Sequence, residues 1–207
     1  DLGLEVAGGR ELDRAGRASL IVCWGRSLPG TSTGVLNANG PKGDKWRELN
    51  LLRAGGISMP SFTMGHRPQG WYARLFHHHS ANDLKKNLTR GDYYVEPVDC
   101  AYEYRIHVFK DRTRSGLKVP GEGVCHPVFR THSCGWVFRY RDIEVSQRVV
   151  NEARKAVTAV DYDFGAVDVG VKRDGTPIVF EVNSAPTLAP STAIWYAKQI
   201  VLYRGGK

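Results

Sequence analysis

The segment FGAVDVGVKRDGTPIVFEVNSAP, residues 164–186, constrains the fold more than any other part of the chain. Two apolar runs flank Asp174 and Gly175, a pair that favours a two-residue turn between antiparallel strands. That turn sets a register in which Asp168 lies directly opposite Glu181. The sequence therefore predicts a β-hairpin that carries one carboxylate within each of its two most apolar strands.

Alternation along this hairpin places Asp168, Glu181 and Asn183 on one face. The other face is apolar and comprises Val167, Val169, Val171, Phe180 and Val182. Two carboxylates directly opposite each other repel and weaken the strand pair. Mg²⁺ prefers oxygen ligands and reverses that cost when it lies between them. The alternative is a solvated sheet surface on which the carboxylates pair with Lys or Arg, and Asn183 favours the metal site.

The remaining patterns predict a mixed architecture of class α+β. Helical spacing and stop signals predict three helices, over Lys42–Gly56, Val145–Val160 and Ser191–Tyr203. Further strands are expected at Ala18–Gly25, Gly70–Phe76, Asp92–Asp99, Tyr102–Lys110 and Gly135–Tyr140. The segment Arg112–Cys134 is rich in Gly, Pro and Arg, so it is expected to be a loop or a weak strand.

The strand expected at Tyr102–Lys110 also separates two kinds of side chain. Its apolar face carries Tyr104, Ile106 and Val108, and its opposite face carries Glu103, Arg105 and His107. A second polar face is thus expected beside the hairpin.

Composition narrows the class of partner. The 207 residues carry a formal net charge of +8, which favours anionic partners such as nucleotides, nucleic acid and acidic metabolites. The four cysteines are too few and too scattered for a disulfide framework in a chain of this length. No apolar run is long enough to span a bilayer, so a soluble, intracellular protein is expected.

The strand pair DFGAVDVGV and IVFEVNSAP resembles the ATP-grasp carboxylate–amine ligases, especially the glutamate-ligase-like branch and its phage-encoded members. The resemblance implies an ATP-grasp-like α+β fold, in which the nucleotide is held between two α+β subdomains built on mainly antiparallel sheets. It implies ATP and Mg²⁺ as cofactors, with Asp168, Glu181 and Asn183 as the metal ligands. It also implies a cytoplasmic protein of a bacterial or phage-infected cell.

Three further segments extend the resemblance upstream. The segment YVEPVDCAYEYRIHVF resembles the hinge of the family, which presents backbone groups to adenine, here Glu96, Pro97, Val98 and Asp99. In the strand that follows, Glu103 matches the acid that binds the ribose hydroxyls and Arg105 matches an arginine near the phosphates. The segments KGDKWRELNLLRAGG and GWYARLF resemble those that carry two basic phosphate contacts, here Lys45 and Arg74.

One segment departs from the family pattern. The family often places a Gly-rich loop over the phosphates after the strand that holds Arg74, but here the residues are HHHSAND, without glycine. The sequence leaves open whether the imidazoles of His77–His79 replace the glycine amides.

The resemblance implies three segments and one reaction. The segments are a small N-terminal α/β segment at residues 1–40, a first ATP-grasp subdomain at 41–100 and a second, with the metal site, at 101–207. The reaction is ATP-dependent formation of an amide from a carboxylate and an amine, through an acyl phosphate, with release of ADP and phosphate. Lys45 and Arg105 are the expected catalytic residues, and the two substrates are not identified.

Two alternatives come from the basic segment that ends near Arg139. Its Arg and Lys side chains are interleaved with Phe129, Trp136 and Phe138, a pattern typical of an anionic groove or of a solvated surface. It raises the possibility of a nucleic-acid-binding protein on an ATP-grasp-like scaffold without ligase turnover. Another phosphoryl transferase on the same scaffold is the second alternative. The spacing from Cys125 to Cys134 matches no common zinc finger and leaves a zinc site open.

Overall fold

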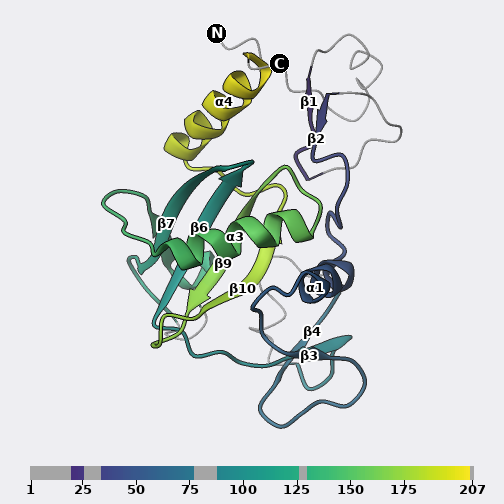
Figure 1. Ribbon diagram of the computed structural model, residues 1–207. Helices are drawn as coiled ribbons and strands as arrows, with labels where there is room; N and C mark the ends of the chain where they lie inside the picture. Colours follow the sequence, from purple (N-terminus) through teal and green to yellow (C-terminus); the bar gives the residue numbers. More distant parts are fainter. Residues whose placement is uncertain (1–19, 26–33, 77–87, 126–129, 206–207) are drawn as a thin grey trace.

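In the computed structural model, the described residues are 20–25, 34–76, 88–125 and 130–205 (Figure 1). Most strands belong to a five-stranded sheet in the order β10-β9-β6-β7-β8, in which every neighbouring pair is antiparallel. Its strands are β6 (Tyr102–Phe109), β7 (Arg112–Pro120), β8 (Trp136–Arg139), β9 (Phe164–Val171) and β10 (Pro177–Asn183). A 3-10 turn at His132–Cys134 precedes β8.

Two smaller sheets come from the first half of the chain. The strands β3 (Phe62–Thr63), β4 (Tyr72–Arg74) and β5 (Tyr93–Val95) form an antiparallel sheet in the order β3-β5-β4. The strands β1 (Ile21–Val22) and β2 (Val35–Leu36) form a short parallel pair. The predicted α+β class, built on mainly antiparallel sheets, is confirmed.

The helices α1 (Lys45–Ala54), α3 (Gln147–Ala159) and α4 (Pro190–Gly205) agree with the three predicted segments. Asp44 begins α1, because its side chain accepts a hydrogen bond of 2.9 Å from the backbone N–H of Arg47. The helix joins two layers. Trp46 contacts the ring of Phe62 on the three-stranded sheet, and Leu52 is fully buried against α3 and the large sheet.

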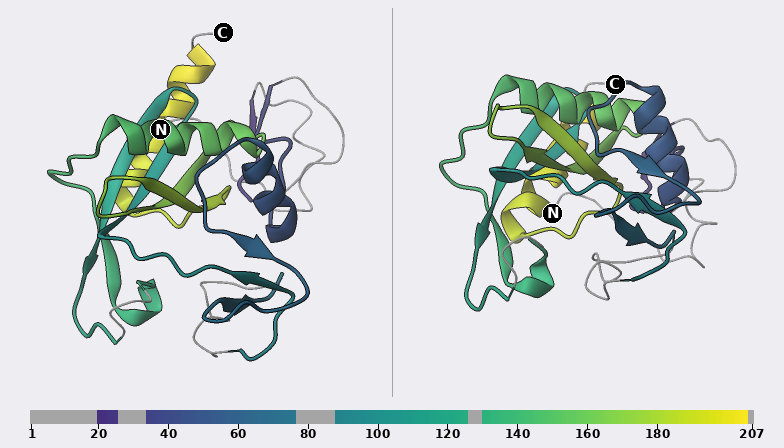
Figure 2. Two further views of the ribbon diagram at one scale, coloured as in Figure 1. Left: turned by 60° about the horizontal axis from the view of Figure 1, so that its bottom comes forward. Right: turned by 90° about the horizontal axis from the view of Figure 1, so that it is seen from below.

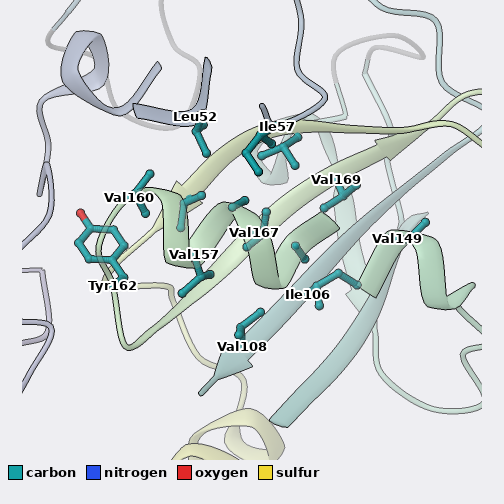
Figure 3. Close-up of a cluster of buried hydrophobic side chains, with 14 of the residues drawn as sticks. Leu52, Ile57, Ile106, Val108, Val149, Val157, Val160, Tyr162, Val167 and Val169 are labelled. Carbon is teal, nitrogen blue, oxygen red and sulfur yellow. The ribbon is translucent and has the colours of Figure 1, made fainter. Parts of the chain in front are cut away.

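The main core lies between α3 and one face of the five-stranded sheet (Figure 3). On β6 and β9 the predicted alternation holds, since Ile106, Val108, Val167 and Val169 all point into this core. The polar residues of the same strands therefore lie on the opposite face.

Helix α4 packs against that opposite face, at the end of β6 and β9 (Figure 2). A second apolar cluster there contains Leu36, Phe109, Phe164, Tyr196 and Ile200. The two helices thus cover different faces of one sheet, and the part of the polar face beyond α4 carries the residues predicted to bind nucleotide.

The turn of the β9–β10 hairpin differs from the predicted one. The N–H of Lys172 donates to the carbonyl of Thr176 at 3.0 Å, so the loop between them holds three residues rather than two. Gly175 adopts a φ of 81°, the left-handed conformation that this longer loop requires. As a result Gly170 lies opposite Ile178, not opposite Val179 as the two-residue turn implies.

A β-bulge corrects the register before the carboxylates. The pairing shifts between Val179 and Glu181, and beyond the bulge Asp168 lies opposite Glu181 as predicted. The predicted position of Phe180 in the apolar core is wrong. A Cβ atom on Gly170 would lie 2.7 Å from the Phe180 ring, which places this ring beside Gly170 on the polar face.

The prediction of a loop or weak strand over Arg112–Cys134 is wrong for its first part. Residues Arg112–Pro120 form β7, which pairs with β6 on one side and β8 on the other. Its glycine has a packing role, because a Cβ atom at Gly116 would lie 2.6 Å from the ring of Tyr140. The small residue lets the Tyr140 ring lie close over the sheet.

A buried histidine joins β6 to α4. His107 is fully buried, with Nδ1 3.2 Å from the Tyr196 hydroxyl and Nε2 3.0 Å from the Tyr140 hydroxyl. Because Tyr196 donates its own proton to the carbonyl of Gly165, it accepts from Nδ1–H, and Nε2 then accepts from Tyr140. Burial, with Arg105 and Arg114 nearby, lowers the pKa of His107 to about 3.

This histidine should make the fold acid-sensitive. The folded pKa lies below that of the unfolded chain, so protonation favours unfolding and stability falls as the pH drops below about 6.5. The free energy of unfolding should be about 2 kcal/mol lower at pH 5 than at pH 7 through this group alone. Denaturant unfolding of His107→Gln at both pH values should show a smaller loss than the wild type. The exposed His66→Gln control should behave like the wild type.

No helix in the described part of the chain combines the length and the apolar character needed to cross a membrane.

Candidate active site

The polar face of the five-stranded sheet is organised in rows that run across the strands. One row contains Glu181 on β10, Asp168 on β9, Arg105 on β6 and Gly116 on β7, each opposite the next. Glu103 lies in a neighbouring row, opposite Gly170 on β9, and its side chain reaches Lys118 on β7. The sheet register therefore brings together residues from distant parts of the sequence.

Arg105 and Asp168 form a bidentate ion pair in this row. The guanidinium donates from Nε to Oδ1 at 2.7 Å and from Nη2 to Oδ2 at 2.8 Å. Both side chains are largely buried, with 18% and 16% exposed. Burial alone would lower the pKa of Arg105, but the Asp168 carboxylate outweighs burial and raises it. The guanidinium also lies 4.5 Å from the centre of the Phe138 ring, which supports it from β8.

Glu181 pairs with a lysine from the first half of the chain. Lys45, at the start of α1, places Nζ 3.0 Å from Glu181 Oε2, and the Asn183 side chain donates to Glu181 Oε1 at 2.8 Å. The Lys45 charge is the largest cause of a pKa of Glu181 well below its usual range. Burial alone would lower the pKa of Lys45, but Glu181 and Glu48 together raise it.

Glu48 was not identified from the sequence, although it completes this group. Its side chain is 5% exposed, with Oε2 3.3 Å from Lys45 Nζ and Oε1 accepting the N–H of Val182 at 3.0 Å. Burial raises the pKa of Glu48, against the opposing effect of Lys45. The three-residue spacing between Lys45 and Glu48 on a helix was the one available signal.

The expected repulsion between Asp168 and Glu181 is wrong for the protein without metal. The two residues are opposite each other, but each carboxylate is turned to a cation, Asp168 to Arg105 and Glu181 to Lys45. The pKa of Glu181 is accordingly lowered, where unrelieved repulsion would have raised it. One lysine and one arginine therefore balance the two carboxylates of this face.

The oxygen donors of this face fit a hard cation. Asp168 and Glu181 supply carboxylates and Asn183 an amide oxygen, a donor set that suits Mg²⁺ when phosphate and water complete the shell. Within the described residues, no group of three or more His, Cys, Asp or Glu side chains is arranged to hold a metal ion. The assignment of these three residues as ligands stays a prediction.

Glu103, the predicted ribose contact, lies one row away from Arg105 on the same face. Its carboxylate is 2.9 Å from Lys118 Nζ and 3.8 Å from Arg130 Nε. The predicted hinge connects β5 to β6, and the N–H of Glu96 donates to the carbonyl of Ser61 at 2.9 Å. The side chains of Glu96, Pro97 and Asp99 are exposed, and that of Val98 is half-buried.

Arg74, the second predicted phosphate contact, lies at the end of β4, opposite Tyr93 and half-buried. It belongs to the three-stranded sheet, whereas Asp168 and Glu181 belong to the large one. His77–His79 and the rest of HHHSAND lie outside the described residues, so their role as a phosphate loop stays a prediction.

The basic segment has partners of its own. Three cations lie near aromatic rings of β8 and its end: Arg130 near Trp136, Lys118 near Phe138 and Arg114 near Tyr140. These contacts neither favour nor exclude nucleic acid as a partner. Cys125 is exposed and Cys134 is buried, and a zinc site between them stays a prediction.

Three comparisons relate this arrangement to known proteins. The D-alanine–D-alanine ligase from Bacillus anthracis is similar with a TM-score of 0.66 and 17% sequence identity, covering 96% of this chain and 84% of the ligase. The ATP-grasp ligase PsnB, complexed with a precursor variant, Mg and ADP, has a TM-score of 0.58 and 15% identity over 84% of this chain and 63% of that chain.

The macrocyclase MdnC from Microcystis aeruginosa MRC, bound with precursor peptide MdnA, has a TM-score of 0.53 and 13% identity over 80% of this chain. The chain spans 61% of the length of MdnC and 58 to 63% of the length of PsnB. At these identities the likeness shows the fold. A search of curated proteins gave no match.

The family comparison covers the hinge, the large sheet and the start of α4. The matching model describes an ATP-grasp domain, the second family of its clade, and it matches residues 87–192, about half of the chain. This span contains Glu103, Arg105, Asp168, Glu181 and Asn183, which the fold brings to one face. The chain therefore belongs to this family of ATP-grasp domains.

Proposed function

We propose that this protein is an ATP-dependent ligase that joins a carboxylate to an amine through an acyl phosphate and releases ADP and phosphate. The observation that supports this best is the row of Glu181, Asp168 and Arg105, with Lys45 bonded to its open end. The row places two carboxylates and two cations on one face of an ATP-grasp sheet, which is the charge pattern that a metal–polyphosphate complex needs.

Each residue of the face has a proposed role. Asp168, Glu181 and Asn183 would hold Mg²⁺, which would neutralise charge on the phosphates of ATP. Lys45 and Arg105 bind phosphate oxygens and stabilise the charge that develops during transfer. Arg74 provides a second phosphate contact from the small sheet. The ribose is bound by Glu103, and the adenine by the backbone of Glu96, Pro97, Val98 and Asp99.

The proposed reaction needs no nucleophile from the protein. A carboxylate oxygen of the substrate attacks the γ-phosphorus of ATP, and the bond to the leaving ADP oxygen breaks. The amine nitrogen then attacks the acyl carbon, the bond from that carbon to the phosphate oxygen breaks, and the amine loses a proton as the amide forms. Positioning and neutralisation of charge account for the rate, and the side chains of this face provide both.

The finer assignments are inferences from the sequence motifs. We place the chain in the glutamate-ligase-like branch, among phage-type members, and in the cytoplasm of a bacterial or phage-infected cell. We assign residues 1–40 to a small N-terminal segment, 41–100 to the first ATP-grasp subdomain and 101–207 to the second. PsnB and MdnC were both solved with precursor peptides, so peptides are one substrate class to test.

The proposal is tested by ADP release. Purified protein with Mg²⁺ and ATP is screened against pooled amino acids and peptides that carry carboxylates and amines, and products are identified by mass spectrometry. ADP should form only when a carboxylate and an amine are both present, with a product whose mass equals the two substrates less one water. ADP release that does not depend on an amine would favour a different phosphoryl transferase.

A further inference from the structure

The proposed function assigns Lys45 to the phosphates and Glu181 to the metal, yet these two residues are bonded to each other at 3.0 Å. Both assignments cannot hold while that bond persists. When Mg²⁺ takes the Glu181 carboxylate, Lys45 must leave it and still remain at the start of α1. Among the described residues, the other carboxylate paired with Lys45 is that of Glu48, at 3.3 Å.

We infer that Glu48 is a positioning residue: it holds Lys45 in place when Mg²⁺ displaces this lysine from Glu181. This inference rests on the proposed function of the site. Glu48 and Lys45 are one helical turn apart, so their contact is independent of the sheet. The ammonium can therefore change from two carboxylates to one carboxylate and a phosphate without leaving its place.

A second contact of Glu48 fixes the strand of the metal ligands. Strand β10 is the edge of the large sheet, so the outward N–H groups of the strand need partners from elsewhere. The N–H of Val182, between Glu181 and Asn183, donates to Glu48 Oε1 at 3.0 Å. One carboxylate thus sets the distance between the lysine and the two proposed ligands beside Val182.

The chain offers a matched control on the neighbouring helix. Glu152 on α3 also accepts a backbone N–H, from Ser58 at 2.7 Å, and the carbonyl of Ser58 accepts from Val179 of β10 at 2.7 Å. Glu152 is therefore a largely buried carboxylate that supports the same strand edge, with 13% of its side chain exposed. Its ion-pair partner is Lys155, not a residue of the site.

The test substitutes glutamine for each glutamate and measures the Mg²⁺ concentration that gives half of the thermal stabilisation by saturating ATP. Glu48→Gln retains an acceptor for Val182 but loses the charge that holds Lys45. Lysine then has only Glu181 as a carboxylate partner and competes with Mg²⁺ for it. The half-saturating Mg²⁺ concentration should rise about tenfold, the equivalent of one charge-assisted hydrogen bond. Glu152→Gln should leave it unchanged.

A double-substitution cycle separates this role from a structural one. If Glu48 acts through Lys45, then Glu48→Gln should have no further effect on the Mg²⁺ requirement in a Lys45→Met background. An equal Mg²⁺ requirement in Glu48→Gln and the wild type, with normal ATP binding, would overturn the role of Glu48 alone. A wild type without any Mg–ATP stabilisation would overturn the proposed function and this inference together.

A measurement on the wild type applies even if Glu48→Gln fails to fold. Reductive methylation of lysines, mapped by mass spectrometry, reports how accessible the Lys45 amine is. With Mg²⁺ and no nucleotide, Lys45 should stay as protected as it is without metal, because Glu48 still holds it. A large rise in its methylation on addition of Mg²⁺ would contradict the inference.

Discussion

Replacing Glu181 with glutamine should abolish the stabilisation of the protein by Mg–ATP and reduce ADP formation by at least about 100-fold. A neutral amide is a far poorer ligand for Mg²⁺ than a carboxylate. The wild type should gain about 2.7 kcal/mol of stability at a Mg–ATP concentration about 100 times its dissociation constant. Thermal melting with and without Mg–ATP, together with an ADP assay, measures both effects.

Without nucleotide, Glu181→Gln should be only slightly less stable than the wild type. The Glu181 side chain is 32% exposed, and Lys45 keeps Glu48 as a partner, so the lost ion pair is worth about 1 kcal/mol or less. The exposed Glu144→Gln is the control and should retain the full response to Mg–ATP. A Glu181→Gln protein that Mg–ATP still stabilises as much as the wild type would remove Glu181 from the metal site.

Arg105→Met should impair both the fold and the reaction. Breaking a largely buried ion pair by removing one partner typically costs about 3 kcal/mol, because Asp168 is left buried without its cation. ADP formation should fall by about 100-fold or more, since a charge that stabilises the transferring phosphoryl group is lost. Denaturant unfolding gives the first effect and the ADP assay the second.

The double variant Arg105→Met/Asp168→Asn separates these two losses. It removes both charges of the pair, so most of the stability should return while ADP formation stays low. Recovery of ADP formation along with stability would mean that Arg105 has only a structural role. Failure of the double variant to regain stability would show that Asp168 is not the group left unpaired in Arg105→Met.

The sequence predicted the position of the hairpin carboxylates for a partly wrong reason. The Asp174-Gly175 pair indicated a two-residue turn, and the structure has a three-residue loop and a bulge near Phe180. The two differences cancel at Asp168 and Glu181. A bulge depends on packing against the neighbouring strand and against Gly170, which local sequence patterns do not report.

The cation partners could not be predicted from pattern alone. Lys45 lies far from Glu181 in the sequence, and Arg105 far from Asp168, so only the order of strands in the sheet brings them together. Period-two alternation did place Arg105 and Glu103 on the correct face of β6. It could not show that β6 lies beside β9, which is what converts two repelling carboxylates into two ion pairs.

The strand β7 was missed because its composition resembles that of a loop. Glycine, proline and arginine usually indicate irregular structure, but here Gly116 makes room for Tyr140 and Pro120 ends the strand. A residue chosen for close packing across the sheet looks the same in sequence as a residue chosen for a turn.

The bulge at Phe180 divides the β9–β10 hairpin into two mechanically separate parts. The outer part ends in the loop at residues 172–176, which is mostly exposed and contains no residue of the site. The inner part, from Glu181 onward, takes its register from β9 and from the bond between Val182 and Glu48. The tip is therefore a place where a tag or a fluorescent label can be inserted while the geometry of the carboxylates is kept.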